Sequence, residues 1–168
     1  DHSPYDTTIL MDCDYFCYTD NLLTYTNIDN DFLIHDKIHD LTGKGTYDFR
    51  KDSIIPMLWA TVIIFQKTNR AKRIFDMVKY IKQHYQYFCK LYRINFPNFR
   101  NDYAFSMAVN QVNGNTQQTF LPGKIPTLPA LAKIIEVKDT GIVFEYDDKI
   151  NEIENQDVHL ISKEIFNV

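Results

Sequence analysis

Thr7-Thr8-Ile9-Leu10-Met11-Asp12-Cys13-Asp14 is the stretch that decides the fold, because an uncharged run ends abruptly in two acidic residues. A short apolar run of this kind is typical of a strand buried in an α/β sheet. Strand geometry alone places Asp12 and Asp14 on the same side. Ligands of open α/β sheets bind at the carboxyl ends of strands. The stretch therefore predicts a ligand site directly after the strand.

The chain on the carboxyl side of this stretch alternates between strand and helix signals. We expect a short helical turn capped by Asp20, a strand over 31–36 and a polar loop over 42–52. The run 58–65 is rich in β-branched and aromatic residues, which favours a central strand.

Two helices are expected in the middle of the chain. Asn69 is a suitable N-cap for a long helix, whose apolar residues recur with helical spacing as far as Tyr92. A second helix should begin near Asn101 or Asp102 and stop at Gly114.

The last part of the chain is expected to contain a loop and three short strands. The segment 119–129 holds three prolines and a glycine and is predicted to be a loop. Strands are predicted over 133–137, 142–146 and 158–161. The alternation predicts an α/β fold, a mixed sheet flanked by helices, and a single domain over residues 1–168.

Composition narrows the class of protein. The 168 residues carry a formal net charge of -4, so a nonspecific nucleic-acid partner is not expected. No apolar run reaches the roughly 20 residues of a membrane span, and no signal peptide is visible. Three cysteines without metal-finger spacing favour free thiols in a reducing compartment. The low Gly and high Tyr, Asn and Ile content suggests an AT-rich genome, microbial or viral. We predict a cytoplasmic protein, located in the host cytoplasm if the source is a virus.

The acidic pair points to a cation. Two carboxylates crowded at a strand end repel each other unless a positive group lies between them. Oxygen ligands suit Mg²⁺ and Mn²⁺, and such a cation keeps positions open for diphosphate oxygens. Alternatively, one of Asp12 and Asp14 caps the following turn and the other is solvated.

Residues 3–14 resemble the strand and Asp-x-Asp element of GT-A type nucleotide-sugar glycosyltransferases, of the glycogenin and galactosyltransferase kind. The resemblance implies a GT-A fold, a Mn²⁺ or Mg²⁺ cofactor, a nucleotide-diphosphate sugar donor and an acceptor hydroxyl. It implies that Asp14 holds the metal directly and that Asp12 contacts both the metal and the donor. GT-A domains carry a nucleotide-binding half before this motif, so we expect the C-terminal portion of the fold, with that half removed or on a second chain.

Three later segments resemble the same family. The run 59–65 is similar to the strand that lines the sugar and acceptor pocket, which implies substrate contacts from Trp59 and Thr61. The motif 100–102 is similar to the acidic motif that faces acceptor and donor sugar, which implies a substrate contact from Asn101. Its neighbour Asp102, ionised at a helix start, is the candidate general base.

The third segment, 157–163, resembles the late metal and diphosphate motif of the family. It implies that His159 completes the metal shell and that Lys163 meets the diphosphate. The family spacing is HxxGxxK, whereas here three residues separate His159 and Lys163 and the glycine is absent. Each of these residues could instead have a purely structural role. On that alternative, Asp102 or Asn101 caps the helix, Trp59 is a core residue, and His159 and Lys163 lie at the surface.

Two other classes of function remain open. A haloacid-dehalogenase-type phosphatase also places Asp-x-Asp after an apolar strand, with the first Asp as nucleophile. Asp147-Asp148 would supply its later acidic pair, although Phe16 stands where that family has Thr or Val. A non-catalytic sugar-binding or interaction module of the same fold is the other alternative. The sequence leaves the sugar, the nucleotide, the acceptor and the stereochemical outcome undetermined.

Overall fold

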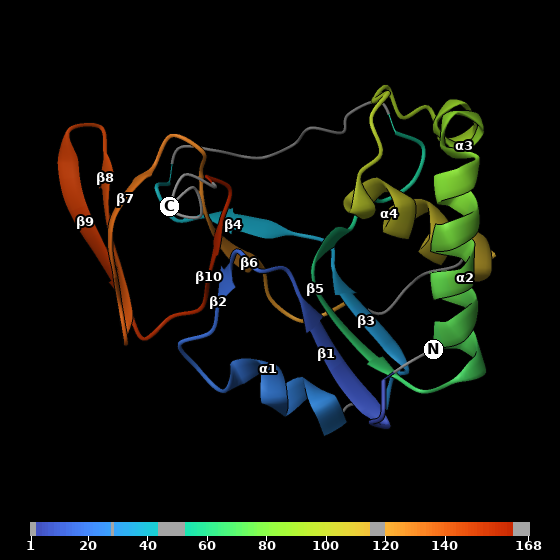
Figure 1. Cartoon of the computed structure of the whole chain (residues 1–168), viewed down its shortest axis with the longest axis horizontal. Helices are drawn as coiled ribbons and strands as arrows, with labels where there is room; N and C mark the ends of the chain where they lie inside the picture. Colours follow the sequence, from blue (N-terminus) through green and yellow to red (C-terminus); the bar gives the residue numbers. More distant parts are fainter. Residues whose placement is uncertain (1–2, 28, 44–52, 115–119, 163–168) are drawn as a thin grey trace.

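A computed structural model describes residues 3–27, 29–43, 53–114 and 120–162 of the chain. Within these residues the protein is a mixed α/β fold with four α-helices and three β-sheets (Figure 1). The expected α/β class is therefore confirmed. The single mixed sheet that we expected is instead divided into three sheets. Of the expected loop over 42–52, residues 44–52 lie outside the described residues.

The first sheet carries the stretch that decided the fold. Its strands are antiparallel in the order β1-β5-β3. They are β1 (Thr7–Met11), β5 (Trp59–Gln66) and β3 (Phe32–His35). The central strand β5 is almost wholly buried because its uncharged, β-branched and aromatic residues meet apolar partners on both faces. All three strands were predicted from the sequence.

Helices cover both faces of this sheet (Figure 1). On one face Ile63 of β5 packs in a core with Ile74 and Met107, all three wholly buried. The helices on this face are α2 (Asn69–Gln83), α3 (Tyr85–Tyr92) and α4 (Asn101–Val112). On the other face Leu22 packs against Val62. It belongs to α1 (Asn21–Thr24), which is followed by the 3₁₀ helix η1 (Tyr25–Asn27).

Helix ends differ from the sequence prediction in three places. The N-cap of α2 is Thr68, not Asn69, because the Thr68 hydroxyl accepts the Ala71 N–H at 3.2 Å. The long helix is interrupted at His84, whose φ of -121° leaves the helical region, so it becomes α2 and α3. Asp20 is the N-cap of α1 but makes no side-chain capping hydrogen bond.

The second sheet is the mixed one, in the order β2-β10-β6-β4. Its strands are β2 (Tyr15–Phe16), β10 (Val158–Leu160), β6 (Ile125–Leu128) and β4 (Ile38–Asp40). The prediction of a loop over 119–129 is wrong for β6. Pro126 is tolerated there although it pairs with His39 of β4, because the Ile125 N–H donates to the Lys37 carbonyl on that side and the pairing to β10 begins only at Thr127.

The third sheet is an antiparallel meander in the order β7-β8-β9. Its strands are β7 (Lys133–Lys138), β8 (Gly141–Tyr146) and β9 (Lys149–Glu154). The sequence predicted β7 and β8 but missed β9, which is mostly exposed and charged at three of its six positions. Asp147 and Asp148 have φ values of 51° and 58° and form the tight turn between β8 and β9.

The first testable prediction concerns His35, at the end of β3. Its side chain is only 5% exposed, and burial lowers its pKa from 6.5 to about 4, although nearby Asp36 opposes the shift. Between these values the unfolded chain binds a proton that the folded chain does not. The contribution of His35 to the free energy of unfolding should therefore fall by about 3 kcal/mol as the pH falls from 7 to 4, and stay constant below.

Urea unfolding at a series of pH values measures this contribution. His35→Gln should remove it, whereas His39→Gln, at an exposed position of β4, should keep the wild-type slope. Equal slopes for wild type and His35→Gln would show that the imidazole of His35 does not titrate in this way.

Candidate functional site

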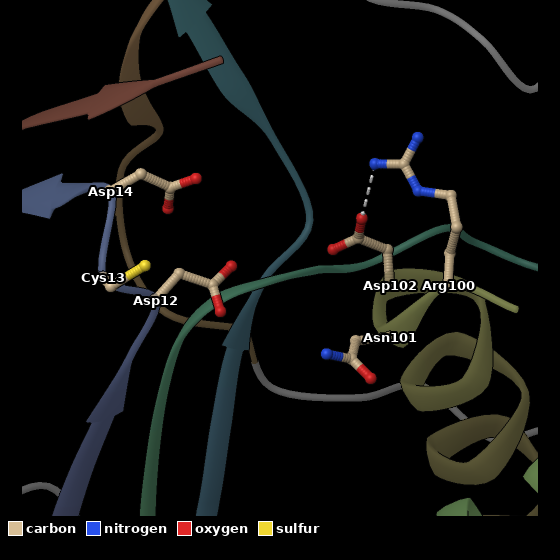
Figure 2. A pocket seen from close by; sticks show the side chains of 6 residues that line it. All are labelled: Asp12, Cys13, Asp14, Arg100, Asn101 and Asp102. Carbon is tan, nitrogen blue, oxygen red and sulfur yellow. Dashed lines mark hydrogen bonds and ion pairs between the residues drawn. The ribbon is translucent and has the colours of Figure 1, made fainter. Parts of the chain in front are cut away.

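A pocket of about 240 Å³ lies where β1 ends and α4 begins. Two segments far apart in the sequence form it, and Figure 2 shows their side chains facing each other across it. The lining residues are Asp12, Cys13, Asp14, Arg100, Asn101 and Asp102. The pocket therefore brings together the two acidic motifs that the sequence singled out.

Asp12 is fixed by the strand that precedes it. Its N–H donates to the carbonyl of Thr61 at 2.9 Å, which extends the β1–β5 pairing by one residue. Its own carbonyl accepts the N–H of Tyr15 at 3.2 Å, so the chain turns here. The side chain of Asp12 points across the pocket toward Asp102 (Figure 2).

Asp14 lies deeper and beside His159. It is 3% exposed, and its carbonyl accepts the Leu160 N–H of β10 at 2.9 Å. The same strand carries His159, 8% exposed, whose Nε2 lies 3.7 Å from Oδ1 of Asp14. The structure thus brings together two of the three predicted metal ligands. The contact suits a neutral imidazole beside a shared cation, and equally an ion pair if His159 is protonated.

Asp102 is held from two directions. Its Oδ1 accepts the Ala60 N–H of β5 at 2.8 Å, and its Oδ2 lies 3.2 Å from Nη2 of Arg100. The N-cap of α4 is Arg100, which makes no side-chain capping hydrogen bond. Asp102 therefore ties its helix to the sheet and presents its carboxylate to the pocket.

One dipeptide of β5 connects both sides of the pocket. The Ala60 N–H binds the carboxylate of Asp102, and the Thr61 carbonyl binds the main chain of Asp12. The position of one acidic side chain relative to the other is therefore set by a rigid, buried strand. This is the kind of support that a preorganised site requires.

Ser106 strengthens the same connection, and its removal is the second prediction. Its hydroxyl accepts the Leu58 N–H at 2.7 Å and donates to the Asp102 carbonyl at 2.6 Å, and the residue is 1% exposed. Ser106→Ala leaves the Leu58 N–H buried without this acceptor. We expect the free energy of unfolding, measured in urea, to fall by about 1–3 kcal/mol. A loss within experimental error would show that this hydroxyl does not hold α4 on β5.

Not all of the remaining predicted site residues line the pocket. Trp59 and Thr61 are 7% and 2% exposed and do not line the pocket. Thr61 contributes to the site through its carbonyl, which binds the Asp12 N–H. Trp59 is a buried core residue, which was the alternative to a substrate contact. Asn101 does line the pocket. Lys163 lies outside the described residues.

Sequence reasoning missed two pocket residues as site residues. Cys13 lies between the two predicted ligands, and Arg100 is the first residue of the predicted motif 100–102, in which only Asn101 and Asp102 were given roles. Adjacency in sequence was the available signal for both. For Arg100 the sequence gives no indication that the guanidinium turns back onto Asp102.

Other acidic residues have structural roles. Oδ1 of Asp157 accepts the N–H groups of Tyr18 and Thr19, each at 2.8 Å, which orders the segment after β2. Asp147 and Asp148 form the β8–β9 turn and do not line the pocket. The acidic pair that favoured a phosphatase is therefore not part of this site.

The candidate cation ligands at the pocket are the carboxylates of Asp12 and Asp14. Among the residues that the structure describes, no three His, Cys, Asp or Glu side chains are grouped so that they could hold a metal ion. Mg²⁺ is bound in many proteins by one or two carboxylates, with substrate phosphates and water as the other ligands. Asp12 and Asp14 at an open pocket match that pattern, and they do not match an all-protein metal cage.

Comparison of the chain with protein-family models, with curated proteins and with solved structures found no match. In the described part of the chain, none of the helices combines the length and the apolar character that crossing a bilayer requires.

Proposed function

We propose that the chain is the catalytic portion of a metal-dependent glycosyltransferase of the GT-A type. It would move a sugar from a nucleotide-diphosphate donor to an acceptor hydroxyl. The observation that carries the proposal is the pocket in which Asp12 and Asp14, at the carboxyl end of β1, face Asp102 at the start of α4. The resemblance of both segments to the motifs of that family supports it.

The residues divide into two roles on this proposal. Asp12 and Asp14 hold a Mn²⁺ or Mg²⁺ ion, with His159 beside Asp14. The cation supplies positive charge to the leaving diphosphate. Across the pocket, Asp102 accepts a hydrogen bond from a sugar or acceptor hydroxyl, and the Asn101 amide offers both a donor and an acceptor to the sugar.

The volume of the pocket indicates how much of a nucleotide sugar it could hold. Pockets that enclose drug-sized ligands are about 300–1,000 Å³, and this one is about 240 Å³. It suits a sugar and diphosphate oxygens better than a complete nucleotide sugar. We therefore propose that the nucleoside of the donor extends beyond this pocket.

Calorimetry with Mn²⁺ and UDP tests the proposal. We expect heat of binding when both are present and much less when either is omitted, because the cation bridges protein and diphosphate. A panel of UDP-sugars then identifies a donor by release of UDP.

Three results would contradict the proposal. Absence of heat at any Mn²⁺ concentration would favour a non-catalytic interaction module. Binding of Mn²⁺ and UDP without turnover of any nucleotide sugar would favour a sugar-binding module. Tight binding of a fluoride–metal phosphate mimic in place of UDP would favour a phosphatase.

A further inference from the structure

We propose that the exposed side of α2 and α3 binds the anionic headgroup surface of a membrane, so that the protein lies on the membrane through these two helices. The inference goes beyond the proposed function and does not rest on it, because the residues that carry it lie outside the pocket.

Positive charge is concentrated in one part of the chain. Residues 67–93, which include α2 and α3, carry eight Lys and Arg residues and a single acidic residue, Asp76. The rest of the chain carries ten Lys and Arg residues against 21 Asp and Glu residues. A formal net charge of -4 therefore conceals a strongly cationic segment in an otherwise acidic protein. Such a separation of charge draws an anionic partner to one part of the molecule.

The basic side chains of this segment lie on its exposed side. The apolar residues of the two helices are turned into the core, where Ile74, Ile81 and Phe88 are buried. All of the basic residues except Arg70, which pairs with Asp31, are exposed. The cationic surface therefore faces outward along both helices.

Some of these cations have no acidic partner within the protein. Lys72 and Lys79 share Asp76, at 2.6 and 3.7 Å. In the part of the chain that the structure describes, no ion pair holds the three remaining cations that the inference uses, which are Arg73, Lys90 and Arg93. Their charge is available to an external anion.

Two exposed tyrosines lie among the cations. Tyr80 is 50% exposed and Tyr87 is 65% exposed. Both rings pack edge to face on the buried ring of Phe88, with ring centres 5.9 and 5.3 Å away. The two tyrosines are thus held in place across the interruption at His84. A tyrosine has an apolar body and a polar tip, which suits it to the boundary between water and lipid.

Aliphatic side chains extend the apolar part of this surface at the end of α3. Leu91 is 48% exposed and lies one helical turn after Tyr87, on the same face. Ile54 is 58% exposed, and its N–H donates to the Tyr92 carbonyl at 3.3 Å, which places it at the same end of the helix. Exposed apolar side chains beside cations are typical of a surface that rests at the boundary between headgroups and acyl chains.

The aliphatic residues favour lipid over other partners. Tyrosine rings also stack on the bases of single-stranded nucleic acids, but Leu91 and Ile54 would have no role there, whereas in a membrane they enter between the acyl chains. A second copy of the chain is disfavoured, because a twofold interface would place this positive surface against itself.

Co-sedimentation with lipid vesicles tests the inference, and it needs neither a metal ion nor a sugar donor. The vesicles are made of phosphatidylcholine alone and of phosphatidylcholine mixed with phosphatidylserine. We expect the protein to bind the anionic vesicles and to remain in solution with the neutral ones. Added salt should weaken the binding, because it screens exposed charges.

Arg73→Gln/Lys90→Gln/Arg93→Gln removes three unpaired cations. Each Lys or Arg near an anionic leaflet raises the binding constant about fivefold, so this variant should bind the anionic vesicles about 100-fold more weakly than wild type. Arg73→Lys/Lys90→Arg/Arg93→Lys keeps the charges and should bind like wild type.

Tyr87→Ser/Leu91→Ser tests the apolar part of the surface. This variant keeps every charge and removes two exposed side chains, so it leaves the core intact. We expect binding about tenfold weaker than wild type, because two partly inserted side chains no longer leave water.

Lys124→Gln/Lys133→Gln/Lys149→Gln is the matched control for charge. All three lysines are exposed, and Lys133 and Lys149 lie on the third sheet, at the opposite end of the molecule from α2 and α3 (Figure 1). The control makes the same change in net charge and should bind the anionic vesicles nearly like wild type.

Three results would overturn the inference. The first is equal binding of neutral and anionic vesicles, or binding of neither. The second is a loss of binding in the control as large as that of Arg73→Gln/Lys90→Gln/Arg93→Gln. The third is tighter binding of single-stranded oligothymidine than of the anionic vesicles, which would make nucleic acid the partner. None of these results affects the experiment with Mn²⁺ and UDP, so the two proposals can fail separately.

Discussion

Asp14→Asn is expected to lower the affinity for Mn²⁺ in the presence of UDP by at least about 100-fold, because loss of a residue that only hydrogen-bonds to a metal ligand already costs about 10–100-fold. Asp14 is 3% exposed and lies beside His159 at the pocket. The amide keeps the shape of the side chain but loses the charge that holds the cation there. Calorimetry with Mn²⁺ and UDP measures the change.

Asp148→Asn is the matched control for this prediction. It makes the same chemical change in the β8–β9 turn, where a φ of 58° is well tolerated by asparagine. The control should bind Mn²⁺ and UDP like wild type. Equal affinities for Asp14→Asn and Asp148→Asn would show that Asp14 does not hold the cation.

Asp102→Asn is expected to have the largest effect on the chemical step. If Asp102 accepts the proton of the attacking hydroxyl, its loss should lower the rate of sugar transfer by about 10²–10⁴-fold. Binding of Mn²⁺ and UDP should stay close to wild type, because Asp102 is held by Arg100 and Ala60 on the opposite side of the pocket. The rate of UDP release from the donor that wild type uses fastest is the measurement.

The two parts of this prediction can fail separately. A transfer rate like that of wild type would remove Asp102 from the chemistry. A loss of Mn²⁺ binding as large as that of Asp14→Asn would make Asp102 a metal ligand.

The strands of the first sheet were predictable because their signal is local. Uncharged, β-branched runs bounded by polar residues gave β1, β3 and β5, and the helical spacing gave α2 and α4. Elements with a weak or conflicting local signal were not predictable. β6 contains Pro126, whose missing N–H lies where β6 is not yet paired to β10, and β9 is charged at three of its six positions and mostly exposed.

The candidate site was predictable residue by residue but not as an arrangement. Asp12, Asp14, Asn101 and Asp102 were identified from short motifs, and all four line one pocket. Their proximity depends on β5, which carries the Ala60–Thr61 link between the two sides. No spacing in the sequence encodes that link. The interruption at His84 is similar, since no Pro or Gly marks it and tertiary packing decides where the helix stops.

A crystal structure with Mn²⁺ and UDP tests the metal site most directly. The predicted result is electron density for a cation at direct coordination distance from Asp14, with diphosphate oxygens on its open positions and with Asp102 still paired to Arg100. No cation at saturating Mn²⁺, with Asp12 and Asp14 bound only to neighbouring main-chain amides, would contradict the proposed function.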